Sequence, residues 1–338
     1  MCEKISGKNL KNIVFLEWVD ADRQYEYPIK KGITMKSVKQ TVEYWCPDIL
    51  TGQYLGQNIR IGVLDTGITL HPDFDSRIIG FRDFVNHREK IYDDGTHGTH
   101  VSGILAGSGK LSAGVYAGMA PQAEILMGKV LDHTGNGSVD HVVAGIEWIL
   151  DIHKKIGLKI VNISVGTQPG LEEEQERHLL DAVEALWDEG LIVVVSAGNY
   201  GPGEGTVAVP GTSRKVITVG AIGDKRSVVM GRGGKTKWNY SGNGPTRECI
   251  VKPDLSAPGT NILSCNGEYT TRWQKPYVTK SGTSMATPVV SGAIACLLSK
   301  YPDMTNVEVK LRLRDTCVLG EEAQQGWGML HVGRLFEG

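Results

Sequence analysis

Ser-Gly-Thr-Ser-Met-Ala-Thr-Pro, residues 281–288, runs directly into an apolar segment that extends to residue 298. The small residues predict a tight turn, and the apolar residues after it recur at helical spacing, so the turn delivers Ser284 to the start of a helix. Backbone N–H groups at a helix N-terminus lack partners and favour negative charge, which suits a nucleophilic hydroxyl. The same residues also suit a helix cap without chemistry, so the rest of the chain has to decide.

The composition is that of an ordinary globular protein. The chain has 338 residues, 41% of them apolar, enough for one large α/β domain or for two domains. A formal net charge of −2 gives no electrostatic basis for binding nucleic acid or an anionic membrane. No apolar run approaches the ~18 residues of a membrane-spanning helix, and residues 1–11 lack a signal-peptide pattern. We therefore expect a cytoplasmic protein whose six scattered cysteines are free thiols.

Upstream of the serine block, apolar runs alternate with segments of helical periodicity. Val-, Ile- and Leu-rich runs separated by helices predict an α/β fold with a mainly parallel sheet covered by helices on both faces. The predicted strands are residues 59–64, 124–130, 159–165, 191–196 and 216–221, and the predicted helices are 97–106, 139–152 and 175–189. Because ligands of such sheets bind beyond the carboxyl ends of the strands, we expect the site there.

Three residues whose side chains can take part in catalysis lie at the ends of predicted strands or helices. Asp65 follows the first predicted strand, His97 begins a predicted helix, and Ser284 begins another. Taken singly, Asp65 could be a turn residue and His97 a helix cap. Together they occur in the chain order Asp, His, Ser, which is the order in subtilisin, whereas α/β-hydrolases and chymotrypsin-like enzymes have other orders.

The amino-acid sequences of these blocks also resemble those of a known protein family. Asp-Thr-Gly at 65–67, His-Gly-Thr-His-Val at 97–101 and Gly-Thr-Ser-Met-Ala at 282–286 resemble the signature blocks of the subtilisin-like serine proteases. The resemblance extends over residues 42–335 and looks closest to the intracellular bacterial branch. It implies a serine endopeptidase with a three-layer fold, in which Asp65 orients His97, His97 is the general base and Ser284 is the nucleophile. It assigns the oxyanion-binding amide to Asn199, which follows the strand 191–196.

The resemblance also implies how a protein or peptide substrate in extended conformation would bind. Two chain segments form edges that hold its main chain by strand addition, and small apolar walls without a carboxylate form the pocket before the cut. We therefore expect a preference for apolar residues such as Leu, Met or Phe at that position. The edges are Gly135, Asn136, Gly137 and Ser164, Val165, Gly166; the pocket is Ser196, Ala197, Gly198 and Ala208; a second pocket is lined by Val139 and Val142. Glycines that only turn the chain are the alternative, chiefly at Gly135.

This chemistry needs no cofactor, and calcium is the one metal that the resemblance raises. Asp73 matches an aspartate that binds calcium in secreted members of the family. The loop that supplies the other ligands reads differently here, as Gly-Ser-Gly-Lys-Leu-Ser at 107–112, and calcium needs six or more oxygen ligands. A structural calcium ion at Asp73 therefore stays an open alternative.

We divide the chain into an N-terminal extension, residues 1–33, and a catalytic domain, residues 34–338. The strand-like residues 13–19 cannot be stable alone. We favour an edge strand added to the catalytic sheet over a plug in the substrate site. The rival functions are a pseudoenzyme that binds peptides without cutting and a hydrolase of non-peptide esters. The presence of all four catalytic residues disfavours the first, and the peptide-binding edges disfavour the second.

Overall fold

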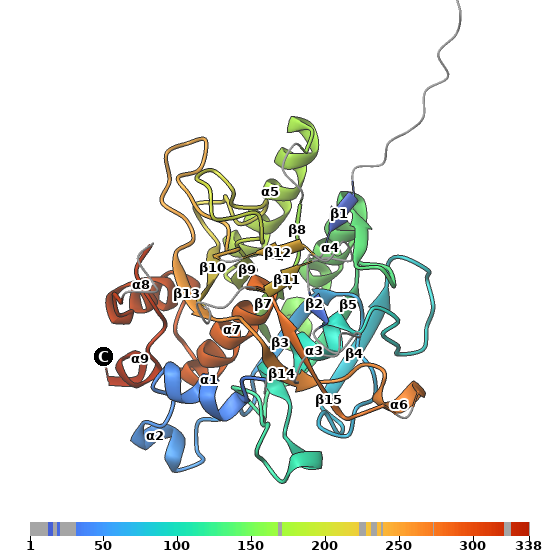
Figure 1. The fold of residues 1–338 in the computed structure, drawn as a ribbon, viewed down its shortest axis with the longest axis vertical. Coiled ribbons are helices and arrows are strands. Elements are labelled where there is room, and N and C mark those ends of the chain that lie inside the picture. Colours follow the sequence, from blue (N-terminus) through green and yellow to red (C-terminus); the bar gives the residue numbers. More distant parts are fainter. Residues whose placement is uncertain are drawn as a thin grey trace, which may run out of the picture.

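A seven-stranded parallel sheet forms the centre of the protein (Figure 1) in the computed structural model, which describes residues 13–15, 19–20, 32–167, 171–222, 228–230, 235–237, 239–272, 274–320 and 326–337. In sheet order the strands are β13 (Leu255–Pro258), β10 (Ile217–Ile222), β9 (Ile192–Ser196), β7 (Leu158–Ile163), β3 (Arg60–Asp65), β5 (Glu124–Lys129) and β4 (Ile78–Asp83). Each neighbouring pair is parallel. The predicted α/β fold is therefore confirmed, with the ends of the five predicted strands within two residues of those observed.

Helices cover both faces of this sheet. α3 (His97–Ala106) packs against α7 (Thr283–Lys300), and α4 (Val139–Ile156) packs against α5 (Glu173–Asp188). Gly62 of β3 faces α4, since a Cβ there would lie 3.1 Å from Cδ1 of Ile149, whereas Asn162 of β7, which is in register with the next residue of β3, accepts a bond from Ser291 of α7. Because successive residues of a strand point to opposite faces of the sheet, the two helix pairs lie on opposite faces.

The strand order reverses at β3. From β3 the chain passes to β4 at one edge of the sheet and returns through α3 to β5 beside β3, and from β5 it passes through α4 to β7 on the other side of β3. Ligands of doubly wound sheets bind outside the carboxyl ends of the strands at such a reversal. Asp65 is the last residue of β3, so the fold itself selects this end of the sheet as the site.

α7 has no exposed face over most of its length. Every residue from Thr283 to Leu298 is buried, which agrees with its weakly amphipathic sequence. A Cβ at Gly292 would lie 2.5 Å from Cβ of Met119, so only glycine permits this close approach to the neighbouring segment. The first turn of α7, which carries Ser284, is thus built into the core.

The remaining elements surround the sheet. Three small antiparallel sheets join β6–β1–β8, β14–β15–β2 and β11–β12. Their strands are β1 (Ile13–Phe15), β2 (Val19–Asp20), β6 (Asn136–Ser138), β8 (Gly166–Thr167), β11 (Val228–Met230), β12 (Lys235–Lys237), β14 (Ile262–Cys265) and β15 (Tyr277–Ser281). The other helices are α1 (Met35–Thr41), α2 (Pro47–Leu50), the 3₁₀ turn η1 (Lys110–Ser112), α6 (Tyr269–Arg272), α8 (Asn306–Thr316) and α9 (Val332–Glu337).

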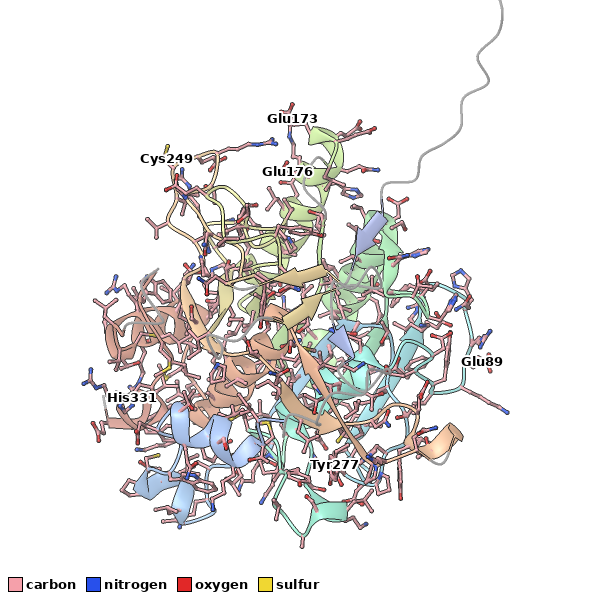
Figure 2. All side chains as sticks on the ribbon, in the orientation of Figure 1. Glu89, Glu173, Glu176, Cys249, Tyr277 and His331 are labelled. Atoms are coloured by element: carbon pink, nitrogen blue, oxygen red, sulfur yellow. The ribbon has the colours of Figure 1, made fainter. Side chains whose placement is uncertain are left out.

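The cysteines in the described residues carry free thiols, as expected. Cys249 projects from an outer loop (Figure 2), whereas Cys46, Cys265 and Cys296 are buried and Cys317 is half-buried. Cys2 lies outside the described residues. Among the described helices, none has both the length and the apolar character needed to cross a bilayer.

Candidate active site

The first two predicted catalytic residues form a buried pair. Nδ1 of His97 lies 2.7 Å from Oδ1 of Asp65, and neither side chain is exposed to solvent. The same carboxylate oxygen accepts a bond from the backbone N–H of Thr66, which fixes it at the end of β3. Because Nδ1 donates to the carboxylate, Nε2 is the nitrogen that can accept a proton when the ring is neutral. The pair therefore has the geometry of a base held in one tautomer.

A second buried carboxylate, Asp93, shapes the turn that presents His97. Its Oδ1 accepts bonds from the hydroxyl of Thr66 and from the backbone N–H groups of Gly95 and Thr96. Its Oδ2 accepts bonds from the hydroxyl and backbone N–H of Thr99 in the first turn of α3. This role was not predicted from the sequence, although Asp93 lies only four residues before His97. Asp93 ties the ends of β3 and α3 together and so sets the separation of Asp65 and His97.

Ser284 stands at the second position of α7. Its hydroxyl donates to the carbonyl oxygen of Ser164 at 2.9 Å, while its own carbonyl oxygen accepts a bond from the Ser164 hydroxyl. The N-cap of α7 is Gly282, whose φ of 154° and ψ of 163° favour glycine strongly. A rotation about χ1 of Ser284 would release the hydroxyl from Ser164, and apo sites often tighten in this way only when substrate binds.

Asn199 is tied to the residue that precedes the serine. Its Oδ1 accepts bonds from the backbone N–H of Thr283 at 2.9 Å and from the Thr283 hydroxyl at 3.1 Å. These bonds assign Oδ1 of the side-chain amide to the side that faces Thr283, so Nδ2 points away from Thr283. Asn199 is buried and lies just after β9, from which Ala197 and Gly198 separate it. The predicted oxyanion donor thus lies beside the start of α7.

The two predicted substrate edges lie on either side of a third strand. That strand is β1, which comes from the N-terminal extension and pairs antiparallel with both β6 and β8. Phe15 faces Asn136 on one side and Gly166 on the other, and Val14 faces Gly137 and Thr167. Asn136, Gly137 and Gly166, three of the six residues predicted to form the edges, therefore pair with an extended segment of this same chain.

The favoured interpretation of the extension as an edge strand on the catalytic sheet is wrong for its described residues. β1 joins β6 and β8, and β2 pairs with β15, but neither belongs to the seven-stranded sheet. In β2, Val19 faces Ser281, three residues before Ser284. Small side chains leave the main chain of β6 and β8 open to pairing. Residues 16–18 lie outside the described residues.

The residues predicted for the pocket before the cut also come together. A Cβ added at Gly198 would lie 2.6 Å from Cβ of Ala208, and one added at Gly166 would lie 2.9 Å from the same atom. The hydroxyl of Ser196 donates to the carbonyl oxygen of Val165 at 3.4 Å, which joins β9 to the β8 edge. Ala197, which precedes Gly198 in the chain, is also buried. Val139 and Val142, predicted to line the second pocket, are buried in the first two turns of α4. These residues are small or apolar, and none carries a charge.

Asp73, the predicted calcium ligand, is surrounded by hydrogen-bond donors. Its carboxylate accepts bonds from the Tyr277 hydroxyl at 2.8 Å, the backbone N–H of Leu111 at 3.1 Å and the Cys265 thiol at 3.7 Å. Burial raises the pKa of the Cys265 thiol, so it stays protonated and donates. A calcium ion needs six or more oxygen ligands, and three donors directed at one carboxylate do not fit that need.

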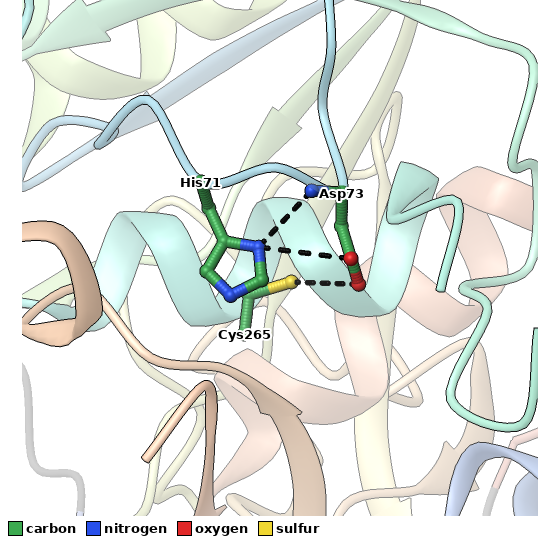
Figure 3. A group of neighbouring side chains, drawn as sticks. All are labelled: His71, Asp73 and Cys265. Atoms are coloured by element: carbon green, nitrogen blue, oxygen red, sulfur yellow. Dashed lines mark hydrogen bonds and ion pairs between the residues drawn. The ribbon is translucent and has the colours of Figure 1, made fainter. Parts of the chain in front are cut away.

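His71 completes this buried group (Figure 3). Its Nε2 donates to the carbonyl oxygen of Pro276 at 2.9 Å, and its Nδ1 accepts from the backbone N–H of Asp73 at 3.2 Å and lies 3.9 Å from the carboxylate. Burial lowers the pKa of His71 and favours the neutral ring. His71, Asp73 and Cys265 thus offer one nitrogen, one oxygen and one sulfur within 4.8 Å of one another, a set that suits zinc better than calcium.

Comparisons with known proteins agree with this geometry. Residues 56–328 match the sequence profile of the subtilase family. Over 280 residues the chain is 41% identical to serine protease AprX of Bacillus subtilis; the match covers 79% of this chain and 63% of AprX. It is 33% identical to subtilisin DY of Bacillus licheniformis, over 87% of this chain and 98% of that protein.

Solved structures give the same result at the level of the fold. Sphericase superposes with a TM-score of 0.68 at 29% sequence identity, over 82% of this chain and 92% of the other. A psychrophilic protease, S41, superposes with a TM-score of 0.67 at 30% identity, over the same shares of the two chains.

Proposed function

The chain belongs to the subtilase family of serine proteases, and from that premise we propose that Ser284 is the nucleophile, His97 the general base and Asp65 the carboxylate that orients His97. One observation carries the proposal. The buried bond between His97 and Asp65 lies at the end of the sheet where the strand order reverses, and Ser284 begins the helix that packs against α3.

The proposed reaction has two stages. Ser284 turns from the carbonyl of Ser164 toward His97, its oxygen attacks the substrate carbonyl, and its proton passes to Nε2 of His97. The oxyanion is stabilised by Nδ2 of Asn199 and by the backbone N–H of Ser284, because first-turn N–H groups have no partner within the helix. His97 then gives its proton to the leaving amine, and a water molecule that loses a proton to His97 releases the acyl group from Ser284. No cofactor is needed for these steps.

The substrate in this proposal is a protein segment in extended conformation. The support is the pairing of β1, which shows that β6 and β8 accept a third, antiparallel strand. A side chain just before the cut would meet Ala208, Gly198 and Ser196, so we propose a preference for Leu, Met or Phe there. A Lys or Asp in those surroundings would be desolvated without a partner, at a cost of several kcal/mol.

We further propose that the extension restrains the enzyme. β1 uses the same two edges that a substrate would use, and β2 pairs immediately before the serine block. An incoming peptide therefore has to displace these strands. Removal of the extension would then activate the protease.

Covalent labelling tests the mechanism. A fluorophosphonate probe should label the wild-type protein once, and Ser284→Ala should abolish both labelling and hydrolysis of a peptide amide. Thr283→Ser is the matched control, because it alters the neighbouring hydroxyl residue and should retain labelling. Peptide hydrolysis by Ser284→Ala above background would refute the covalent route.

A substrate library tests the pocket. kcat/KM is measured for peptides that vary only at the residue before the cut, and the optimum should be an apolar side chain. An optimum at Lys or Arg would refute the pocket assignment. A folded protein that binds these peptides without cutting any of them would favour the pseudoenzyme alternative.

A further inference from the structure

Lys280 places a buried cation beside the proposed catalytic base. It is the fourth residue of β15, four residues before Ser284, and it has no exposed surface. Its Nζ donates at 3.0 Å to the hydroxyl of Thr96, the residue directly before His97. Burial is the main cause that lowers the pKa of His100, and the positive charge of Lys280 adds to it, so the ammonium group lies close to α3. A buried charge in such a place is costly unless an anion accompanies it.

The backbone register gives Lys280 a defined partner position. β15 pairs antiparallel with β2, and Asp20 stands directly opposite Lys280 while Val19 stands opposite Ser281. Residues directly opposite in an antiparallel ladder present their side chains to the same face, with Cβ atoms about 4.5–5.5 Å apart. A peptide that follows the register of β2 therefore brings one side chain to Lys280. In this chain's own extension the residue at that position is acidic.

The chain direction places this position on the leaving-group side of the cut. Along the extension, β1 between β6 and β8 comes first and β2 against β15 comes second. Three residues separate Phe15, which faces Gly166, from Val19, which faces Ser281. A substrate that binds in the same direction contacts β6 and β8 before its scissile bond and β15 after it.

We propose that Lys280 determines specificity, selecting substrates with Asp or Glu on the leaving-group side, at the residue that pairs with it in the register of β2. This inference rests on the proposed function. In the extension, Asp20 occupies the register position opposite Lys280, so a substrate bound in this register takes the place of β2 there. A carboxylate at this position accepts a charge-assisted bond, whereas an amide of the same shape makes only a neutral one.

The test compares Asp with Asn in matched peptides. Fluorogenic peptides share Leu before the cut and carry Asp or Asn, in turn, at the second, third or fourth residue after it. With the full-length chain, kcat/KM should favour Asp about fivefold at one of these positions. The Asp-to-Asn ratio is the readout because occupancy of the site by the extension and any loss of folded protein cancel in it.

Variants separate selection from structure. Lys280→Met should bring the Asp-to-Asn ratio close to one, and Lys280→Arg should retain the preference. Lys275→Met, the matched control, removes an exposed lysine five residues earlier and should leave the ratio unchanged. A ratio that Lys280→Met does not alter, or the absence of any Asp preference in peptides that are cut, overturns the inference and leaves the proposed function standing. If no peptide is cut at all, both fall.

A measurement on the wild-type protein alone guards against a Lys280 variant that fails to fold. Synthetic peptides of residues 12–22, with Asp20 or with Asp20→Asn, are compared as inhibitors of the cutting of one fluorogenic substrate. The Asp20 peptide should inhibit at about fivefold lower concentration. Equal inhibition by the two peptides contradicts the inference.

Discussion

Deletion of the residues before Gly32 should raise kcat/KM about 30-fold. β1 and β2 form seven register pairs with the catalytic domain, three with β6, two with β8 and two with β15. An antiparallel ladder has on average one hydrogen bond per pair, and each is worth ~1 kcal/mol net, about 7 kcal/mol together. Ordering the five paired residues costs ~1 kcal/mol each. The remaining ~2 kcal/mol corresponds to about 30-fold occlusion of the site.

The assay compares the full-length chain with the chain that begins at Gly32. Both are measured on one fluorogenic peptide with Leu before the cut, at substrate concentrations well below KM. Intact mass, recorded before and after, verifies that the full-length protein has not lost its extension, and circular dichroism verifies that both proteins are folded. If kcat/KM changes by less than threefold with the fold intact, the restraint proposed for the extension is refuted.

Three further outcomes are expected. Asn199→Ala should lower kcat by roughly 10²–10³-fold with KM little changed. This magnitude is the one known for the corresponding donor in a subtilisin and is not worked out from this structure. A kcat within twofold of wild type would exclude Asn199 as the oxyanion donor. EDTA should leave Tm unchanged within about 1 °C, because protein donors already occupy the Asp73 carboxylate, and a fall of several degrees that calcium reverses would contradict this. Burial lowers the pKa of Lys39 to about 8, so its charged form destabilises the folded state below that pH and this cost fades as pH rises toward ~10.5. Lys39→Met removes this cost together with the contact between Lys39 and the Tyr44 ring. It should therefore raise the free energy of urea unfolding by ~2 kcal/mol at pH 7 and by clearly less at pH 9.5. An equal rise at both pH values would refute this explanation.

The sheet could be predicted because its central strands are buried on both faces and carry nearly continuous apolar runs. β9 reads Ile-Val-Val-Val-Ser, and no residue in it is exposed. The edge strands β4 and β13 escaped prediction for the opposite reason. β4 mixes half-buried and exposed residues, and β13 is four residues long and ends in Pro258, so neither has a clear period in sequence.

The candidate site divides in the same way. Asp65, His97, Ser284 and Asn199 lie in short blocks whose spacing along the chain already indicates a shared role. Asp93 and Lys280 support or flank these residues through contacts between segments distant in sequence, and local patterns carry no signal for such contacts. The partner of the extension was mispredicted because strand propensity says that residues 13–15 must pair, but not with which strand.

The burial of α7 has a consequence for how the protein melts. Enzymes whose reactive groups lie on mobile loops lose activity through local opening, well before the whole molecule unfolds. Here Ser284 belongs to a helix with no exposed face from Thr283 to Leu298, packed on four strands of the central sheet. The proposed nucleophile therefore cannot leave its place without breaking the main cooperative unit, so we expect hydrolytic activity to report directly on the global folding equilibrium.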